Sequence, residues 1–186
     1  MAAMLITFLA VTTSCTVLSS GANPAYPELN PALGKYQSAS PCLPLKETWY
    51  SLYRNYETDP LFGGTAKCGR FDIPSPAVNG TYQISAQYGE ISEQVLLTLS
   101  SSEGYDAGNV VHFSKTGEDA SAVAYIAYDN CEECAIYRNT YVNEEACVVY
   151  VPESALRKKK TCCDFVFDLL CGNGEKYYTY DESCKH

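Results

Sequence analysis

The side chains that could carry acid–base or nucleophilic chemistry are few. The chain has two histidines, His112 and His186, so a Ser–His–Asp or Cys–His arrangement would depend almost entirely on His112. Cys131 and Cys134 form a Cys-x-x-Cys pair, but no second pair follows at zinc-finger spacing, and no thioredoxin-like βαβ pattern surrounds it. We therefore expect a protein that is not an enzyme and that has neither a metal site nor a cofactor.

Cysteine is far more frequent than usual. Ten of the 186 residues are cysteines, and they are spread over most of the chain. Such usage is typical of proteins that fold in an oxidising compartment, where thiols pair as disulfides. We therefore interpret these cysteines as structural.

The N-terminal segment supports export. Residues 2–17 are apolar and uncharged, too few to span a membrane comfortably, and lead into the small residues of 19–22. We interpret 1–21 as a signal peptide whose removal takes Cys15 with it; a lipoprotein modification of Cys15 is the alternative. No later apolar run is long enough to span a membrane, so we expect a secreted, extracellular product.

The net charge of −9 argues against nucleic acid as a partner, because the phosphates would be repelled. The same charge is compatible with a cationic small ligand. It is also a common route to solubility, so it does not by itself indicate a ligand.

The rest of the pattern indicates a mainly β protein. Thr161-x-x-Asp164 resembles a capping box, and apolar residues at 162, 166, 169 and 170 predict one helix over 161–171, with Gly172 after it. Residues 22–44 are an irregular arm, and 172–186 form a tail with a short strand at 176–180. Eight strands at roughly ten-residue spacing followed by a helix predict an eight-stranded antiparallel lipocalin barrel, with the C-terminal α-helix packed outside and 22–186 forming one domain. The expected strands are 45–56, 66–73, 81–88, 91–100, 109–115, 123–128, 134–138 and 147–151.

Several segments resemble the tick salivary lipocalins, the family that includes the histamine-binding proteins. Their order and spacing carry the resemblance over most of the chain. The matching segments are NPALGKYQS at 30–38, YSLYRNYETDPLFGGTAKC at 50–68, the run ending AYIAYDNC at 117–131, NEEACVVY at 143–150, CDFVF at 163–167, and the final cysteine at 184.

The resemblance also implies part of a disulfide pattern. It pairs Cys68 with Cys184, and Cys131 with Cys162 or Cys163. Independently of the family, Cys134 and Cys147 lie on consecutive expected strands and could bridge across them, which leaves Cys42 and Cys171 as a possible pair. One cysteine then stays free, and we expect it to be one of the adjacent Cys162 and Cys163, which cannot easily bond to each other.

The amine-binding motif of this family is Cys-Asp-aliphatic followed later by Glu-Leu-aromatic. Here it corresponds to Cys131-Glu132-Glu133 or Cys134-Ala135-Ile136, and then to Val148-Val149-Tyr150. Tyr150 keeps the aromatic ring, but Val148 replaces the glutamate. Losing that charge-assisted contact would cost about 1.5–3 kcal/mol, roughly ten- to hundredfold in affinity.

Other candidate ligand-binding residues come from the same resemblance. They match the family's upper pocket (Tyr56, Asp59, Phe62), its lower amine site (Glu93, Glu132, Trp49) and a pocket tyrosine (replaced here by His112). Each has a structural alternative: a turn carboxylate for Asp59, an outward strand carboxylate for Glu93, and core packing for Trp49. A cationic His112 would disfavour an amine and favour an acidic lipid.

The resemblance implies a secreted salivary lipocalin that sequesters a small host mediator and so counters host inflammation and haemostasis. Histamine or serotonin is the first ligand class. A lipid mediator such as a leukotriene is the alternative, and a host protein bound through the loops is another. We expect a monomer with a glycan at Asn79, because Asn79-Gly80-Thr81 is an acceptor sequence at an expected turn.

Overall fold

The computed structural model describes residues 26–117 and 119–184. The expected signal peptide at 1–21 and the first residues of the arm lie outside this part of the chain. Within the described ranges, no helix is both long enough and apolar enough to cross a membrane.

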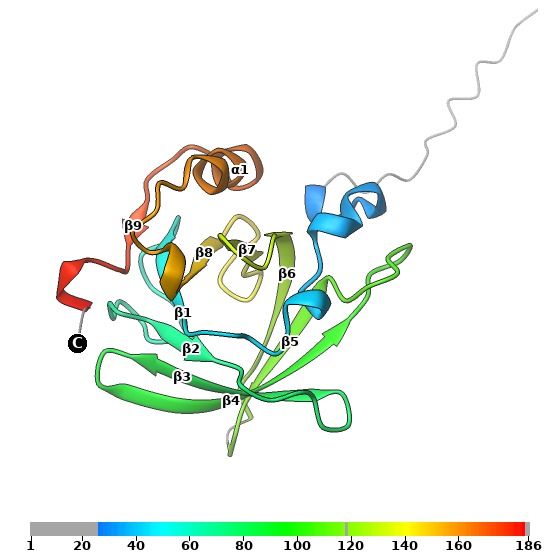
Figure 1. Cartoon of the computed structure of the whole chain (residues 1–186), viewed down its shortest axis with the longest axis horizontal. Helices are drawn as coiled ribbons and strands as arrows, with labels where there is room; N and C mark the ends of the chain where they lie inside the picture. Colours follow the sequence, from blue (N-terminus) through cyan, green and yellow to red (C-terminus); the bar gives the residue numbers. More distant parts are fainter. Residues whose placement is uncertain (1–25, 118, 185–186) are drawn as a thin grey trace, which may run out of the picture.

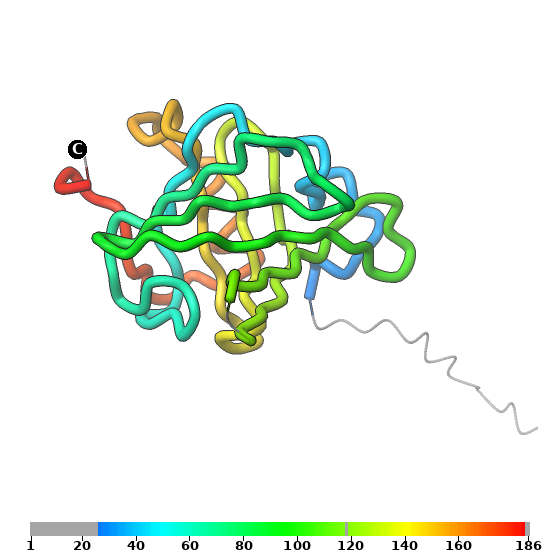
Figure 2. Tube along the Cα trace, turned by 90° about the horizontal axis from the view of Figure 1, so that it is seen from below, coloured from blue at the N-terminus to red at the C-terminus, as the bar shows by residue number. Residues whose placement is uncertain are grey.

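The strands form one closed antiparallel barrel, which confirms the predicted fold class. The hydrogen-bonded order is β2-β3-β4-β5-β6-β7-β8-β1, and β1 also pairs with β2, so the sheet closes on itself. A short ninth strand, β9, pairs with Tyr53 and Arg54 at the end of β1. Figures 1 and 2 show the strands wrapped around one interior. Their bounds are β1 Trp49–Arg54, β2 Arg70–Asp72, β3 Thr81–Tyr88, β4 Ile91–Ser100, β5 Val110–Lys115, β6 Ser121–Asp129, β7 Ala135–Arg138, β8 Cys147–Pro152 and β9 Tyr177–Tyr178.

A two-residue turn at Asn79-Gly80 leads into β3. Asn79 and Gly80 have φ values of 52° and 78°, a left-handed pair that Asn-Gly adopts in two-residue hairpin turns. Val78 and Thr81 exchange two backbone hydrogen bonds across it, at 2.9 and 3.0 Å. Asn79 itself is exposed.

Helix α1, Thr161–Cys171, has the predicted bounds, and part of the predicted apolar face packs on the barrel. It lies outside the barrel, beside β7 and β8 (Figure 1). Cys163 and Phe167 are buried against the barrel, and Val166 and Leu170 are half-buried against the same core, whereas Cys162 and Leu169 are exposed. The expected capping box is wrong, since the N-cap is Lys160 and makes no side-chain capping bond.

Cys68 is bonded to Cys184, as the resemblance implies. Two other expectations are wrong. Cys131 is bonded to Cys42 of the arm rather than to the helix. Cys134 does not reach Cys147, because β7 and β8 pair Ala135 with Tyr150 and Arg138 with Cys147, which places the two cysteines at opposite ends of this ladder.

The helix is instead linked to the barrel at both ends. Cys134 is bonded to Cys163 near the start of α1, and Cys147 to Cys171 at its end. The expected Cys42–Cys171 pair is therefore wrong as well, since Cys42 holds the arm to the loop after β6. Cys162 is the free cysteine of the described residues.

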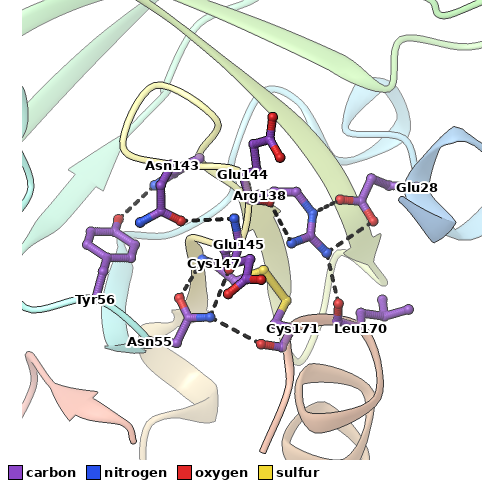
Figure 3. The surroundings of a disulfide bond; sticks show 11 residues. Glu28, Asn55, Tyr56, Arg138, Asn143, Glu144, Glu145, Cys147, Leu170 and Cys171 are labelled. Atoms are coloured by element: carbon purple, nitrogen blue, oxygen red, sulfur yellow. Dashed lines mark hydrogen bonds and ion pairs between the residues drawn. A yellow bond between two sulfur atoms is a disulfide. The ribbon is translucent and has the colours of Figure 1, made fainter. Parts of the chain in front are cut away.

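The arm consists of three short 3₁₀ helices, Pro27–Leu29, Pro31–Tyr36 and Ser40–Cys42. Its Glu28 is fully buried and forms an ion pair with Arg138 of β7. Figure 3 shows that the same guanidinium also donates to the carbonyl oxygen of Leu170, at 2.8 Å, and to that of Glu144, at 3.2 Å. Arg138 thus joins the arm, helix α1 and the β7–β8 loop.

Candidate functional site

A cavity lies within the barrel, and most of the side chains that line it are apolar. The arm closes one end of it through Ala39, Cys42 and Leu43. Aliphatic and aromatic side chains make up nearly all of the remaining wall: Leu45, Trp49, Phe62, Phe71, Ile73, Ile84, Ala86, Tyr88, Val95, Leu97, Phe113, Ala135, Tyr137, Tyr141 and Tyr150.

Asp129 is the one carboxylate among the described residues that line this cavity. It is the last residue of β6, and its side chain is buried, with the residue 8% exposed. Its Oδ1 accepts a hydrogen bond of 2.8 Å from the backbone N–H of Cys131 and lies 3.3 Å from the Cys42 sulfur. That disulfide sulfur carries no hydrogen, so within residues 26–117 and 119–184 the backbone N–H of Cys131 is the one hydrogen-bond donor to this carboxylate.

Burial raises the pKa of Asp129 to about 7, and the hydrogen bond from Cys131 offsets only part of this effect. A carboxyl group with such a pKa is protonated in a substantial fraction of molecules near neutral pH. A cation placed beside it would stabilise the ionised form instead.

Aromatic rings surround the space next to Asp129. Trp49 at the start of β1 is 4% exposed. Tyr150 packs edge-on against Phe71 and Tyr137, with ring centroids 5.1 and 5.5 Å apart. Burial holds the pKa of Tyr137 and Tyr150 well above the usual value, so both phenols keep their protons and can donate hydrogen bonds. Such a set suits a flat ligand that carries a cation.

A β-bulge explains why Asp129 faces inward. In the first part of β6, Ala122 pairs with Phe113 and Ala124 pairs with Val111 of β5. Phe113 lines the cavity, so alternation along β6 places Ala122, Ala124 and Ile126 on the inner face. The ladder with β7 shifts between Ile126 and Tyr128, so that Asp129 pairs with Ala135, which lines the cavity. Strict alternation would have turned Tyr128 inward and Asp129 outward.

A smaller cavity lies beside the larger one and shares some of its wall. Ser51, Arg54, Tyr56, Asp59 and Val148 are part of its lining. Arg54 faces inward because the β1–β8 ladder shifts between Ser51 and Tyr53, and it pairs directly with Val148 across the ladder. The position where family histamine binders carry a glutamate therefore holds a valine opposite a buried arginine.

Asp59 has no free acceptor capacity for a ligand. Oδ1 accepts from the backbone N–H groups of Leu61 and Phe62, at 3.0 and 2.8 Å. Oδ2 accepts from the hydroxyls of Tyr56 and Tyr141, at 3.1 and 2.8 Å. Asp59 therefore holds the turn after β1 together, which is the structural alternative expected for an Asp-Pro turn.

The other candidate residues from the upper pocket lie nearby. Phe62 lines both cavities and packs edge-on against Phe113 and Tyr141, with centroids 5.6 and 5.7 Å apart. Tyr56 is buried, and its hydroxyl also accepts a hydrogen bond of 2.8 Å from the Asn139 amide. The structure thus brings Tyr56, Asp59 and Phe62 together.

Two candidate ligand residues do not face the interior, and those expectations are wrong. His112 lies on β5 between Val111 and Phe113, and Phe113 lines the cavity, so the imidazole points outward and shares a 2.7 Å hydrogen bond with Ser100. Glu132 is exposed in the loop that connects β6 and β7. Sequence resemblance does not fix the strand register, and the register decides which face of the barrel each of these residues occupies.

Glu93 faces inward but is separated from Glu132 by the length of β6. It pairs with Ala86, which lines the larger cavity, and residues directly opposite on antiparallel strands share a face. Lys115 pairs with Val95 on the same inner face and binds Glu93 at 2.9 Å. The expected acidic pair of Glu93 and Glu132 is therefore absent from this region.

The comparisons with known proteins agree with this geometry. The family model described as "Tick histamine binding protein" matches residues 27–186. Among solved structures, a crystal structure of AM182 in complex with serotonin superimposes with a TM-score of 0.55 and 18% identity, covering 76% of this chain and 86% of that one. Lobster apocrustacyanin A1 gives a TM-score of 0.49 and 12% identity, with 75% and 79% coverage. No curated protein matches the chain.

A closed eight-stranded barrel with an interior cavity and an external helix defines a lipocalin of the small-ligand-binding class. The family match covers most of the chain. This chain therefore belongs to the tick histamine-binding protein family.

Proposed function

We propose that this protein binds an aromatic monoamine such as serotonin or histamine in the larger cavity, with the ammonium beside Asp129. The observation that carries the proposal is the single buried carboxylate in an otherwise apolar and aromatic wall. An ammonium is the group that such a carboxylate lacks, because one backbone N–H does not compensate for its burial.

The ring of the ligand would lie among Trp49, Tyr137 and Tyr150. These side chains offer flat apolar faces, and the two phenols supply donors for a hydroxyl or a ring nitrogen. The AM182 complex contains serotonin, and family membership supports the same class of ligand here.

The biological role that we propose is sequestration of a host mediator by a secreted, monomeric protein. Four disulfides support passage through an oxidising compartment. The exposed Asn79 at a two-residue turn is accessible to glycosylation. The family match supports the link to tick saliva and to evasion of host defence.

An apolar lipid mediator is the second candidate ligand. The favouring observation is the apolar wall, in which a protonated Asp129 would behave as a neutral hydrogen-bond donor. The argument from a cationic His112 does not apply, since that side chain faces outward.

Isothermal titration calorimetry of the secreted form, starting at residue 22, separates the two ligands. Serotonin, histamine and leukotriene B4 are titrated into the native protein and into Asp129→Asn. We expect the amine affinity to fall roughly ten- to hundredfold in Asp129→Asn, because a charge-assisted contact is lost.

Glu132→Gln is the matched control, because it removes the same charge from an exposed loop, and it should leave the affinity unchanged. Equal amine binding by Asp129→Asn and the native protein would contradict the proposed site. Tight leukotriene binding without amine binding would favour the second candidate.

A further inference from the structure

Arg54 is a buried cation whose partners are all neutral. It is the last residue of β1, it is 5% exposed, and it lines the smaller cavity. Its Nη2 donates to the carbonyl oxygens of Glu57 and Gly64, both at 2.6 Å, and the guanidinium lies 4.9 Å from the centroid of the Tyr56 ring. Its Nε is buried and has no hydrogen-bond partner among the described residues. A buried charge is costly unless an opposite charge pairs with it, so this guanidinium lacks a counter-ion.

The side chains around Arg54 do not supply that counter-ion. Asp59 lines the same cavity, but its two oxygens already accept four hydrogen bonds, and within the described part of the chain no carboxylate forms an ion pair with Arg54. Directly opposite Arg54 on β8 lies Val148, which is apolar. The charge at this place in the barrel is therefore opposite in sign to the one that the resemblance implied for position 148.

Two phenols add neutral donors to the same space. Tyr88 and Tyr150 line the smaller cavity, and burial raises the pKa of each phenol well above its usual value, so both keep their protons at neutral pH. A guanidinium together with hydroxyl donors suits a carboxylate. Tyr88, Tyr150 and Phe62 also line the larger cavity, so the two spaces adjoin each other.

We propose that the smaller cavity binds a carboxylate, with Arg54 as its counter-ion and the phenols of Tyr88 and Tyr150 as further donors. This site is distinct from the amine position beside Asp129 and goes beyond the proposed function. The carboxylate belongs either to a small free acid or to an apolar acid whose tail enters the larger cavity, and the two sources give different affinities.

Calorimetric titration of native protein with dodecanoate, dodecanol and acetate tests the site without any substitution. Dodecanol has the tail of dodecanoate but no charge, so it should bind roughly ten- to hundredfold more weakly near neutral pH. Acetate separates the two sources. Dodecanoate binding at least tenfold tighter than acetate would place a tail in the larger cavity, whereas acetate binding as tightly as dodecanoate would indicate a small free acid.

Val148→Glu should close the site from within. The new carboxylate lies directly opposite Arg54 and can take the place of the ligand carboxylate. The bound acid should therefore be at least tenfold weaker in Val148→Glu than in Val148→Gln, which has the same shape without the charge. Arg54→Met removes the guanidinium itself and should weaken the acid by a similar factor.

Arg70→Gln is the matched control for the loss of one positive charge. Arg70 precedes Phe71 on β2, and Phe71 lines the larger cavity, so strand alternation turns Arg70 outward. Its guanidinium donates to Gln87, at 3.0 and 2.6 Å. Acid affinity in this variant should equal that of native protein.

Equal acid affinity in native protein, Val148→Glu and Arg54→Met would overturn the inference. Dodecanol binding as tightly as dodecanoate, with no binding of acetate, would overturn it as well. If Arg54→Met fails to fold because the carbonyl oxygens of Glu57 and Gly64 lose their donor, Val148→Glu still tests the site with the guanidinium in place. These titrations contain no amine, so acid binding supports the site even if serotonin does not bind, and its absence leaves the amine proposal untouched.

Discussion

At the residue scale, what matters is which face of a strand a side chain occupies. Trp49, Phe62 and Tyr150 line the cavity, whereas His112 points outward. Asp129 was not predicted as a ligand residue, because the polar pair Asp129-Asn130 is typical of a turn. The only signal in the sequence was its position at the end of a strand, and the bulge that turns it inward has no clear signature there.

Val148→Glu tests how far the family's amine site persists. Arg54 lies directly opposite Val148, so the new carboxylate should pair with the buried guanidinium rather than with a ligand. We therefore expect calorimetry to show amine affinity within about threefold of the native value, since little new charge faces the ligand.

A tenfold or larger gain in amine affinity would contradict this expectation, because it would show that the introduced carboxylate reaches the ammonium. Val148→Gln is the control, as it has the same shape without the charge.

At the element scale, strand alternation and turn chemistry gave most of the barrel. The bounds of β3 and β4 and of helix α1 were predicted to the residue, because Asn79-Gly80 marks one hairpin and Gly172 the end of the helix. The apolar pattern placed Val166 and Leu170 correctly but not Cys162 and Leu169, which are exposed. The sequence does not show which of the adjacent Cys162 and Cys163 faces the barrel. In the structure it is Cys163, which is bonded to Cys134.

The attachment of the arm depends on a buried ion pair, so Glu28→Gln should destabilise the protein. Arg138 is 4% exposed, and in Glu28→Gln its charge would keep neutral partners, among them the carbonyl oxygens of Leu170 and Glu144, but no carboxylate. Removing one partner of a buried ion pair costs about 3–5 kcal/mol. Unfolding in guanidinium chloride with the disulfides intact would measure the loss.

Asp181→Asn is the control, since it breaks the exposed ion pair with Lys67, and exposed pairs contribute little to stability. Equal unfolding midpoints for Glu28→Gln and Asp181→Asn would show that the ion pair between the arm and β7 does not stabilise the fold.

At the scale of the whole molecule, the disulfides and the arm make the barrel a rigid container. Two disulfides attach the helix to β7–β8, a third attaches the arm to the loop after β6, and a fourth attaches the tail to the segment before β2. Of the inward carboxylates, Glu93 pairs with Lys115 and Asp59 accepts four hydrogen bonds, whereas Asp129 accepts one backbone hydrogen bond. Composition and family resemblance predicted a ligand-binding barrel. Which charged side chains face the ligand depends on the strand register, which neither of them fixes.

The central claim is that an ammonium pairs with ionised Asp129, and the pH dependence of amine affinity tests it most directly. The pKa of Asp129 is about 7, so below that pH the free protein is protonated there and must release a proton to bind a cation. Serotonin affinity should therefore be constant above about pH 8 and fall towards tenfold per pH unit below about pH 6. A primary amine stays protonated throughout this range.

Calorimetry of native protein and Asp129→Asn between pH 5 and pH 9 makes the measurement. The affinity should fall at low pH in native protein, and it should be weak and nearly independent of pH in Asp129→Asn. An affinity that is constant across this range in native protein, or that falls equally in both proteins, would contradict it.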